Sequence, residues 1–225
     1  NYYVVKHPKF HPYIMDGANY LRLTGKKYDV IMNDSIWPFY AGNSGLYTKD
    51  YFEAGRRHLK EGGFMTSWLP LQIDPEDFKI LLNTFHSVFP HVSVWVAMTH
   101  YNKHALIVGS EKKIEIDKPR IVERYNRFAK KHLQIIAIDS PIQLLNTFLM
   151  DEKTFGDEIN SAVIHTEDSP VLEFSLSRGN TTNVQMRVYD FMRNRLSSVS
   201  PYLVNLQARQ RDDVVTTLAA ANQAT

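Results

Sequence analysis

The sequence contains no cysteine among its 225 residues. This absence excludes a disulfide framework, a thiolate metal site and a cysteine nucleophile. Neither sign of charge dominates, because 26 Lys and Arg residues are interspersed with 24 Asp and Glu residues. The resulting net charge of +2 gives no field that would favour nucleic acid as a partner. No apolar run in the sequence reaches the roughly 18 to 20 residues that a membrane helix requires.

Several motifs of known chemistry are also missing. The sequence has no Gly-x-Ser-x-Gly elbow, no phosphate-binding loop and no HExxH pair. His100 and His104 are four residues apart but fall in an expected loop, where helical spacing has no meaning, so we expect no metal. The opening residues resemble neither a signal peptide nor a natural initiator, which suggests a fragment or a processed chain. Composition leaves the compartment open, with the cytosol as the easier fit.

What is present is an alternation of strand and helix patterns over the first half of the chain. The apolar fraction of 44% is enough for a substantial core. We expect strands at residues 10–15, 28–32, 64–71, 92–98, 105–108 and 171–176, and helices at 18–23, 49–60, 75–89, after Pro119, and at 140–150, 183–196 and 201–221. Such an order predicts an α/β fold with a Rossmann-like, doubly wound and mostly parallel sheet, an antiparallel hairpin at its edge, and C-terminal helices.

The stretch around residues 27–52 is the most informative part of the sequence. Residues 28–32 are typical of a buried parallel strand covered on both faces, and polar residues follow at once. Ligands of open α/β sheets bind beyond the carboxyl ends of the strands. Asp34 therefore becomes the first candidate for a catalytic residue, with an ordinary polar loop residue as the alternative. Pro38 and two glycines predict a long loop that ends where Thr48 can cap a helix.

Seven collinear segments of the chain resemble the polyamine aminopropyltransferase (spermidine synthase) family, especially its divergent bacterial members that are fused to membrane segments. They are DGANYL at 16–21, KYDVIMND at 27–34, GLYTKDYF at 45–52, HLKEGG at 58–63, SWLPL at 67–71, FPHVSVW at 89–95 and HTEDSPVLEFSLSR at 165–178. The resemblance implies the fold type of class I S-adenosylmethionine-dependent transferases. It also implies transfer of an aminopropyl group from decarboxylated S-adenosylmethionine to an amine such as putrescine.

Roles for individual residues follow from this resemblance. Asp34 corresponds to the carboxylate that takes a proton from the amine. Asp16 and Gly17 correspond to the corner that contacts adenine, although Asp-Gly pairs also simply turn a chain. Ser35 belongs to the same cofactor-binding group. The substrate-binding candidates are Tyr101, Trp37, Trp68 and Tyr40.

The alternatives for these substrate-binding residues remain open at this point. Tyr101 is equally compatible with an exposed loop tyrosine, and Trp68 with core packing. Tyr40 and Tyr47 flank the loop and are candidates to close on substrate. The family pattern Asp-Ser-Ser-Asp-Pro reads Asp34-Ser35-Ile36-Trp37-Pro38 here, so Trp37 replaces a second acid that grips the substrate. This departure puts the usual diamine, or the reaction itself, in question.

The resemblance also suggests where this chain lies in a family member. It lacks the glycine-rich turn and the ribose-binding acid of the family, so we expect it to begin one third of the way into the catalytic domain and to be inactive alone. We assign residues 1–110 to the C-terminal part of that domain, 111–178 to a helical and edge-strand extension, and 179–225 to a C-terminal helical segment.

Three functions remain open: an aminopropyltransferase, an S-adenosylmethionine-dependent methyltransferase, and a catalytically silent domain that serves assembly or sensing. The expected partners are a small-molecule amine and a second copy in a homodimer, with no nucleic acid. The expected location is cytoplasmic, on the cytoplasmic face of the inner membrane if the full-length chain carries a membrane module.

Overall fold

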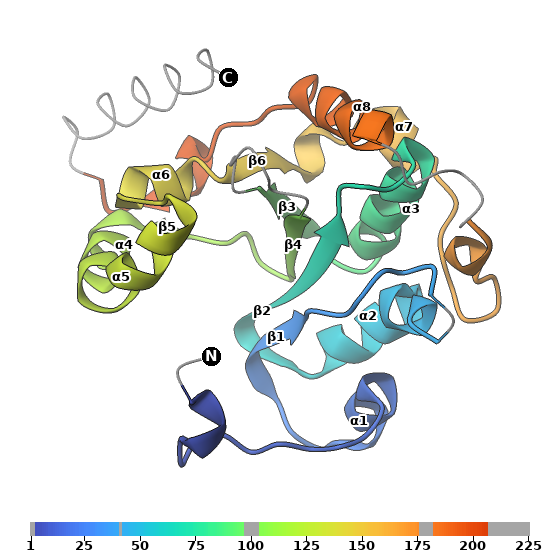
Figure 1. The fold of residues 1–225 in the computed structure, drawn as a ribbon, viewed down its shortest axis with the longest axis horizontal. Helices are drawn as coiled ribbons and strands as arrows, with labels where there is room; N and C mark the ends of the chain where they lie inside the picture. Colours follow the sequence, from blue (N-terminus) through green and yellow to red (C-terminus); the bar gives the residue numbers. More distant parts are fainter. Residues whose placement is uncertain (1–2, 41, 97–103, 176–181, 207–225) are drawn as a thin grey trace.

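The computed structural model of the protein describes residues 3–40, 42–96, 104–175 and 182–206. Its centre is a five-stranded sheet with the strand order β1-β2-β4-β3-β6, shown in Figure 1. The strands are β1 (Tyr28–Asn33), β2 (Leu59–Pro70), β3 (His91–Trp95), β4 (His104–Ser110) and β6 (Phe148–Asp151). β1 and β2 are parallel, and the other neighbouring pairs are antiparallel. Three strands, β1, β2 and β3, therefore run in one direction, and β4 and β6 run in the other.

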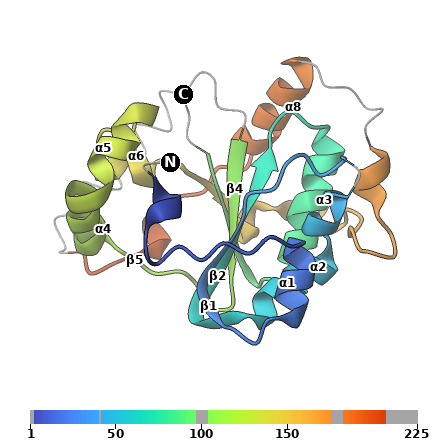
Figure 2. The same cartoon turned by 60° about the horizontal axis from the view of Figure 1, so that its bottom comes forward.

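Helices lie on both sides of this sheet, as Figure 2 shows, with α1, α2 and α3 on one side and α4, α5 and α6 on the other. The α-helices are α1 (Gly17–Leu23), α2 (Lys49–Arg57), α3 (Pro75–His86), α4 (Lys118–Arg124), α5 (Lys130–Leu133), α6 (Pro141–Leu145), α7 (Gly156–Asn160) and α8 (Thr182–Arg193). A π-helical turn, Tyr125–Ala129, joins α4 to α5, and short 3₁₀ turns include η2 (Ser44–Tyr47) and η6 (Val171–Phe174). No helix within the described ranges has the length and apolar character needed to cross a membrane.

The helix boundaries follow from their capping residues. Thr48 accepts a hydrogen bond from the backbone of Tyr51 and so begins α2, as the sequence predicts. Asp74 caps α3 in the same way, with Pro75 in the first turn. The α3 helix places Phe78, Leu82 and Phe85 in the core, where each is almost completely buried.

The structure confirms the α/β class and the antiparallel pairing of β3 with β4. It places this hairpin inside the sheet rather than at its edge, because β6 adds outside β3. β6 occupies the end of the predicted helix 140–150. The helix stops at Leu145, and the apolar residues Phe148 to Met150 then pair with β3, where all three are buried.

Several other expectations about local structure are wrong. Residues 171–174 form the turn η6 instead of an edge strand, because local backbone hydrogen bonds to Pro170 and Leu172 satisfy this segment. Residues 10–15 form no strand, since no described strand pairs with them. The helix expected from Pro201 is replaced by the 3₁₀ turn Ser200–Tyr202 and then by the short strand β7 (Leu203–Val204), which pairs with β5 (Ile116–Asp117). The remainder of that prediction lies outside the described residues.

The strand β1 is covered on one face only, which also differs from the prediction. Ile31 and Asn33 are buried, whereas Val30 and Met32 are 43% and 67% exposed. β1 is also an edge strand of the described sheet, with β2 as its partner there. The buried face of β1 carries Asn33, the residue directly before Asp34.

Gly109 in β4 allows the α3 region to pack directly on the sheet, and this contact can be tested. A Cβ atom at Gly109 would lie 2.4 Å from Phe85 and 2.6 Å from Phe89. We expect Gly109→Ala to lower the free energy of unfolding by about 1–3 kcal/mol through overpacking. Urea denaturation measures the change. Gly25→Ala is the matched control, because no atom lies within 4 Å of its added Cβ. Equal stability of the two variants would contradict the packing argument.

Candidate active site

The side chain of Asn33 organises the carboxyl edge of the parallel pair. Asn33 is the last residue of β1 and is buried. Its amide nitrogen donates hydrogen bonds to the backbone oxygen of Leu46 at 2.9 Å and to the hydroxyl of Ser67 at 3.0 Å. Ser67 lies opposite Asn33 in β2, and Leu46 belongs to η2. One buried amide thus connects β1, β2 and the loop that leads to α2.

Asp34 follows directly and has an exposed side chain at this edge. The backbone beyond it is held by Tyr47, whose hydroxyl donates to the carbonyl oxygens of Ser35 and Ile36 at 3.3 Å and 3.2 Å. Tyr47 is completely buried. Burial raises the pKa of the Tyr47 phenol well above its ordinary value, and the charge of Asp34 adds to this effect. Tyr47 is therefore a neutral donor that supports the loop, and it does not face substrate as the sequence suggested.

Two tryptophans lie beside each other at the same edge. The rings of Trp37 and Trp68 meet edge to face, with centroids 5.9 Å apart and an interplanar angle of 84°. Trp68 also donates from its indole nitrogen to Nδ1 of His104 at 2.9 Å, which leaves the His104 hydrogen on Nε2. Both tryptophans are partly buried and pack against the main core. The packing of Trp68 agrees with the core interpretation, and its role in substrate binding stays a prediction.

Asp16 caps α1, because its carboxylate accepts a hydrogen bond from the backbone of Asn19 at 2.8 Å. This is the structural role of an Asp-Gly turn, and Asp16 as a whole is exposed. Gly17 lies against Leu46, whose side chain would be 3.8 Å from a Cβ at this position. The charge of Asp16 also acts on Tyr51, whose pKa is raised to about 12 mainly by burial. The α1 corner therefore lies next to η2, the same turn that Asn33 holds.

The structure thus brings most of the predicted residues to one region. The carboxyl edge carries Asp34, Trp37 and Trp68. Asp16 and Gly17 lie beside η2, which is hydrogen-bonded to Asn33 at this edge. The hydroxyl of Ser35 is buried and has no hydrogen-bond partner among the described residues, and Tyr40 is 50% exposed. Tyr101 lies outside the described residues. The roles predicted for all these residues remain predictions.

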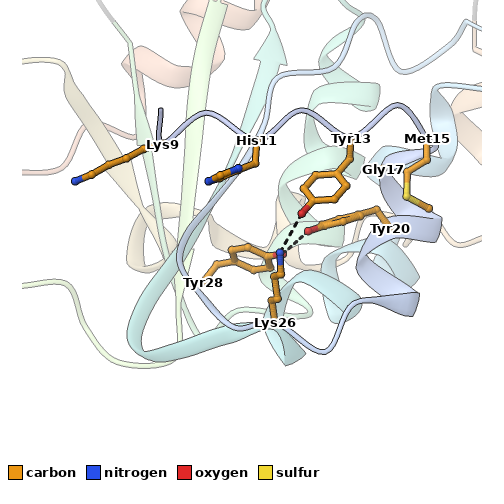
Figure 3. A pocket seen from close by; sticks show the side chains of 8 residues that line it. All are labelled: Lys9, His11, Tyr13, Met15, Gly17, Tyr20, Lys26 and Tyr28. Carbon is orange, nitrogen blue, oxygen red and sulfur yellow. Dashed lines mark hydrogen bonds between the residues drawn. The ribbon is translucent and has the colours of Figure 1, made fainter. Parts of the chain in front are cut away.

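A groove of about 510 Å³ lies on the other side of Gly17. Its lining residues are Lys9, His11, Tyr13, Met15, Gly17, Tyr20, Lys26 and Tyr28, which Figure 3 shows. The ammonium of Lys26 donates to the hydroxyl of Tyr13 at 3.2 Å, and this contact raises the pKa of Lys26. No carboxylate lines the groove. A cationic amine would meet only positive charge and phenols there, so the groove does not suit an amine substrate.

Sequence reasoning missed three residues that build this region. Asn33 follows the predicted strand 28–32, Ser67 lies within the predicted strand 64–71, and His165 is the first residue of the matching segment 165–178. Each of them is buried, as Ser44 also is. The signal in the sequence was a polar residue within an apolar run. Such a residue is buried together with the run and needs a hydrogen-bond partner. The sequence does not say which partner it finds. Within the described ranges, no group of three His, Asp or Glu side chains is placed to hold a metal ion.

Fold and site together define an α/β protein with an exposed carboxylate, Asp34, and an aromatic pair at the carboxyl edge of its parallel strands. Residues 2–119 match the model of the spermine/spermidine synthase domain. Because this match covers just over half of the chain, the protein belongs to the spermine/spermidine synthase domain family.

Individual relatives match over shorter segments. A polyamine aminopropyltransferase of Pectobacterium atrosepticum is 38% identical over 60 residues, which are 27% of this chain and 21% of the relative. One from Streptococcus uberis is 42% identical over 53 residues, 24% of this chain and 18% of the relative. These matches span about a fifth of the length of the curated relatives.

Solved structures are similar over larger parts of the chain. A probable spermidine synthase of Corynebacterium glutamicum is 17% identical with a TM-score of 0.48, and the similarity covers 69% of this chain and 53% of that one. The spermidine synthase of Thermotoga maritima is 20% identical with a TM-score of 0.43, with coverage of 77% and 48%.

The support that Tyr47 gives to the loop leads to a stability prediction. Tyr47→Phe removes the hydroxyl and leaves the carbonyl groups of Ser35 and Ile36 without their donor. We expect a loss of about 1–3 kcal/mol in the free energy of unfolding, measured by urea denaturation. Tyr40→Phe is the control in the same loop, since Tyr40 is half exposed and the change should stay within about 0.5 kcal/mol. If Tyr47→Phe has the wild-type free energy of unfolding, these hydrogen bonds do not hold the loop.

Proposed function

We propose that this chain forms part of an aminopropyltransferase, which moves the aminopropyl group of decarboxylated S-adenosylmethionine to an amine such as putrescine. The observation that carries the proposal is the placement of Asp34. Its exposed carboxylate follows β1 at the carboxyl edge of the parallel pair, inside the segment that matches the family. This is the edge at which α/β sheets bind their ligands.

The chemistry requires a proton acceptor. An alkylamine has a pKa of roughly 10 and is therefore almost entirely protonated and non-nucleophilic at neutral pH. In the proposed reaction the amine nitrogen attacks the aminopropyl carbon next to the sulfonium. The Asp34 carboxylate accepts a proton from the bound ammonium as the attack begins, which frees the nitrogen lone pair. The new C–N bond then forms as the C–S bond breaks, and methylthioadenosine leaves with the electron pair of that bond. Asp34 also attracts the cationic amine before the reaction.

The aromatic pair gives the amine a second contact. A cationic or partly cationic amine is stabilised over the face of a tryptophan by about 0.5–2 kcal/mol. Trp37 and Trp68 offer such faces at the carboxyl edge that also carries Asp34, and Trp37 stands where the family pattern described above has a second acid. We infer that one end of the acceptor contacts Asp34 and its remainder lies along the indoles.

The remaining assignments complete the proposal. Asp16 and Gly17 would contact the adenine of the donor, Ser35 would support the donor side, and Tyr101 and Tyr40 would lie near the amine. The activity belongs to the complete protein, which we propose to be a homodimer. The boundaries near residues 110 and 178 are kept as proposed limits of the catalytic domain and its extension.

The first test concerns Asp34 in the complete protein. Asp34→Asn preserves the side-chain volume but removes the proton acceptor and its charge. We expect kcat/KM for aminopropyl transfer to fall by about 10²- to 10⁴-fold, measured from methylthioadenosine release. Asp29→Asn is the matched control on the same strand, because Asp29 is paired with Lys60 at 2.8 Å and lies at the other end of β1. We expect it to keep the wild-type rate.

The outcomes of this test separate the three functions. A variant Asp34→Asn with wild-type product formation would remove Asp34 from the mechanism. Methylated amine as the product, with tighter binding of the carboxylated donor in calorimetry, would identify a methyltransferase. A complete protein that makes neither product would indicate a silent domain.

A second test concerns the specificity that Trp37 confers. Trp37→Asp places a second carboxylate near Asp34, and we expect it to raise the preference for diamines over monoamines about tenfold, since hydrogen bonds to charged groups contribute about 1.5–3 kcal/mol. The measurement is the ratio of kcat/KM for the two acceptors in one preparation, so that any loss of folded protein cancels. Trp37→Phe should leave the ratio near the wild-type value. An unchanged ratio in Trp37→Asp would mean that this position does not contact the acceptor.

A further inference from the structure

His165 is a completely buried histidine that the proposed reaction does not use. It contacts three separate elements. Its backbone nitrogen donates to the hydroxyl of Thr84 in α3 at 2.9 Å, and its backbone oxygen accepts from Lys49 at the start of α2 at 2.9 Å. Its side-chain Nε2 donates to the backbone oxygen of Ser44 in η2 at 3.0 Å. His165 thereby connects the sheet-covering helices to the loop after β1.

The segment that follows His165 makes further hydrogen bonds to η2 and α2. The hydroxyl of Ser44 donates to a carboxylate oxygen of Glu173 at 3.3 Å. The backbone nitrogen of Glu167 donates to the carboxylate of Asp50 in α2 at 2.9 Å. Ser44 is therefore held at its backbone by His165 and at its side chain by Glu173. Both contacts join parts of the chain more than a hundred residues apart.

The turn that His165 holds is the turn that positions Asp34. Two residues after Ser44, the backbone oxygen of Leu46 accepts from Asn33, the residue before Asp34. The next residue, Tyr47, donates to the carbonyls of Ser35 and Ile36, just after Asp34. The backbone on both sides of Asp34 thus depends on where η2 lies.

We propose that His165 is a positioning residue for the candidate active site: it fixes η2 against α2 and α3 and so orients Asp34 without contacting substrate. The expected loss of catalytic rate rests on the proposed function, whereas the expected loosening of η2 does not. Removal of the anchor should lower kcat more than it changes KM, because misplacement of a reacting group by about 1 Å can cost roughly 10²-fold in rate.

The protonation of His165 supports this role. Nδ1 is buried and has no hydrogen-bond partner among the described residues, which is the arrangement of a neutral imidazole with its hydrogen on Nε2. Burial lowers the pKa of His165 from its ordinary value of 6.5, opposed by the hydrogen bond to Ser44 and by the charges of Glu173 in η6 and Asp50 in α2. Above pH 6.5 the imidazole is neutral whether buried or exposed. Below pH 6.5, the His165 imidazole takes up a proton more readily when it is released from its buried position. The anchored arrangement therefore becomes less stable as pH falls.

Two variants of the complete protein test the proposal. His165→Leu removes the donor to Ser44, whereas His165→Gln keeps an N–H donor at about the position of Nε2. For His165→Leu we expect faster amide hydrogen exchange in residues 42–48 and a kcat reduced by about tenfold or more, with KM changed less than about twofold. For His165→Gln we expect exchange and kcat within about threefold of wild type. His91→Leu is the control, since His91 pairs with Glu152 outside this region and should change neither quantity.

The pH dependence provides a second readout of the anchoring contact made by His165. After correction for intrinsic exchange rates, wild-type residues 42–48 should exchange faster at about pH 5.5 than at about pH 7.5, and His165→Gln should lack this difference.

Wild-type exchange in His165→Leu, or an equal loss in the Gln and Leu variants, would overturn the proposal. A wild-type protein that transfers no aminopropyl group, together with faster exchange in His165→Leu, would refute the proposed function and support the positioning role.

Discussion

The buried amide of Asn33 is the contact on which the rest of the candidate site depends. It is the residue at which the regular ladder of β1 ends, and its two hydrogen bonds join β2 and η2. A buried amide without partners would be costly, so the loop is drawn to the strand end. The placement of Asp34 on the surface, one residue later, follows from this constraint. A carboxylate that remains in water next to a rigid backbone is well suited to meet a cationic substrate.

Electrostatics divide the region around Gly17 into two parts. The carboxyl edge holds an exposed carboxylate and two indoles, whereas the groove between α1 and the start of β1 carries two lysines, a histidine and three phenols. Coulomb attraction directs a positively charged amine to the first part and away from the second. Gly17 in the α1 corner lines the groove and also lies against Leu46 of η2. The division agrees with the proposal that Asp34, rather than the groove, holds the amine.

The strands and helices with strong local signals were predictable from sequence. The β1 run, the Thr48 cap and the Asp74-Pro75 start of α3 lie where propensity and capping place them. The strand predictions for residues 10–15 and 171–176 were wrong for one reason: an apolar segment becomes a strand only if a neighbouring strand supplies hydrogen bonds. The opposite error concerns Phe148: the sequence predicted that the helix continues through this residue. In the structure this segment pairs with the edge of β3 and forms β6. Tyr47 illustrates the limit for side chains, since composition does not reveal whether a loop tyrosine faces solvent or core.

The sequence by itself determined the α/β class, the absence of thiol chemistry and the presence of an acid directly after the first parallel strand, because these depend on composition and on local periodicity. Only the tertiary structure decided that Asn33, Tyr47 and His165 together hold the backbone around that acid, and that Trp37 lies against Trp68. These contacts join residues far apart in the chain, and hydrogen-bond partners at such separations are chosen by the packing of whole elements, which no local pattern of residues encodes.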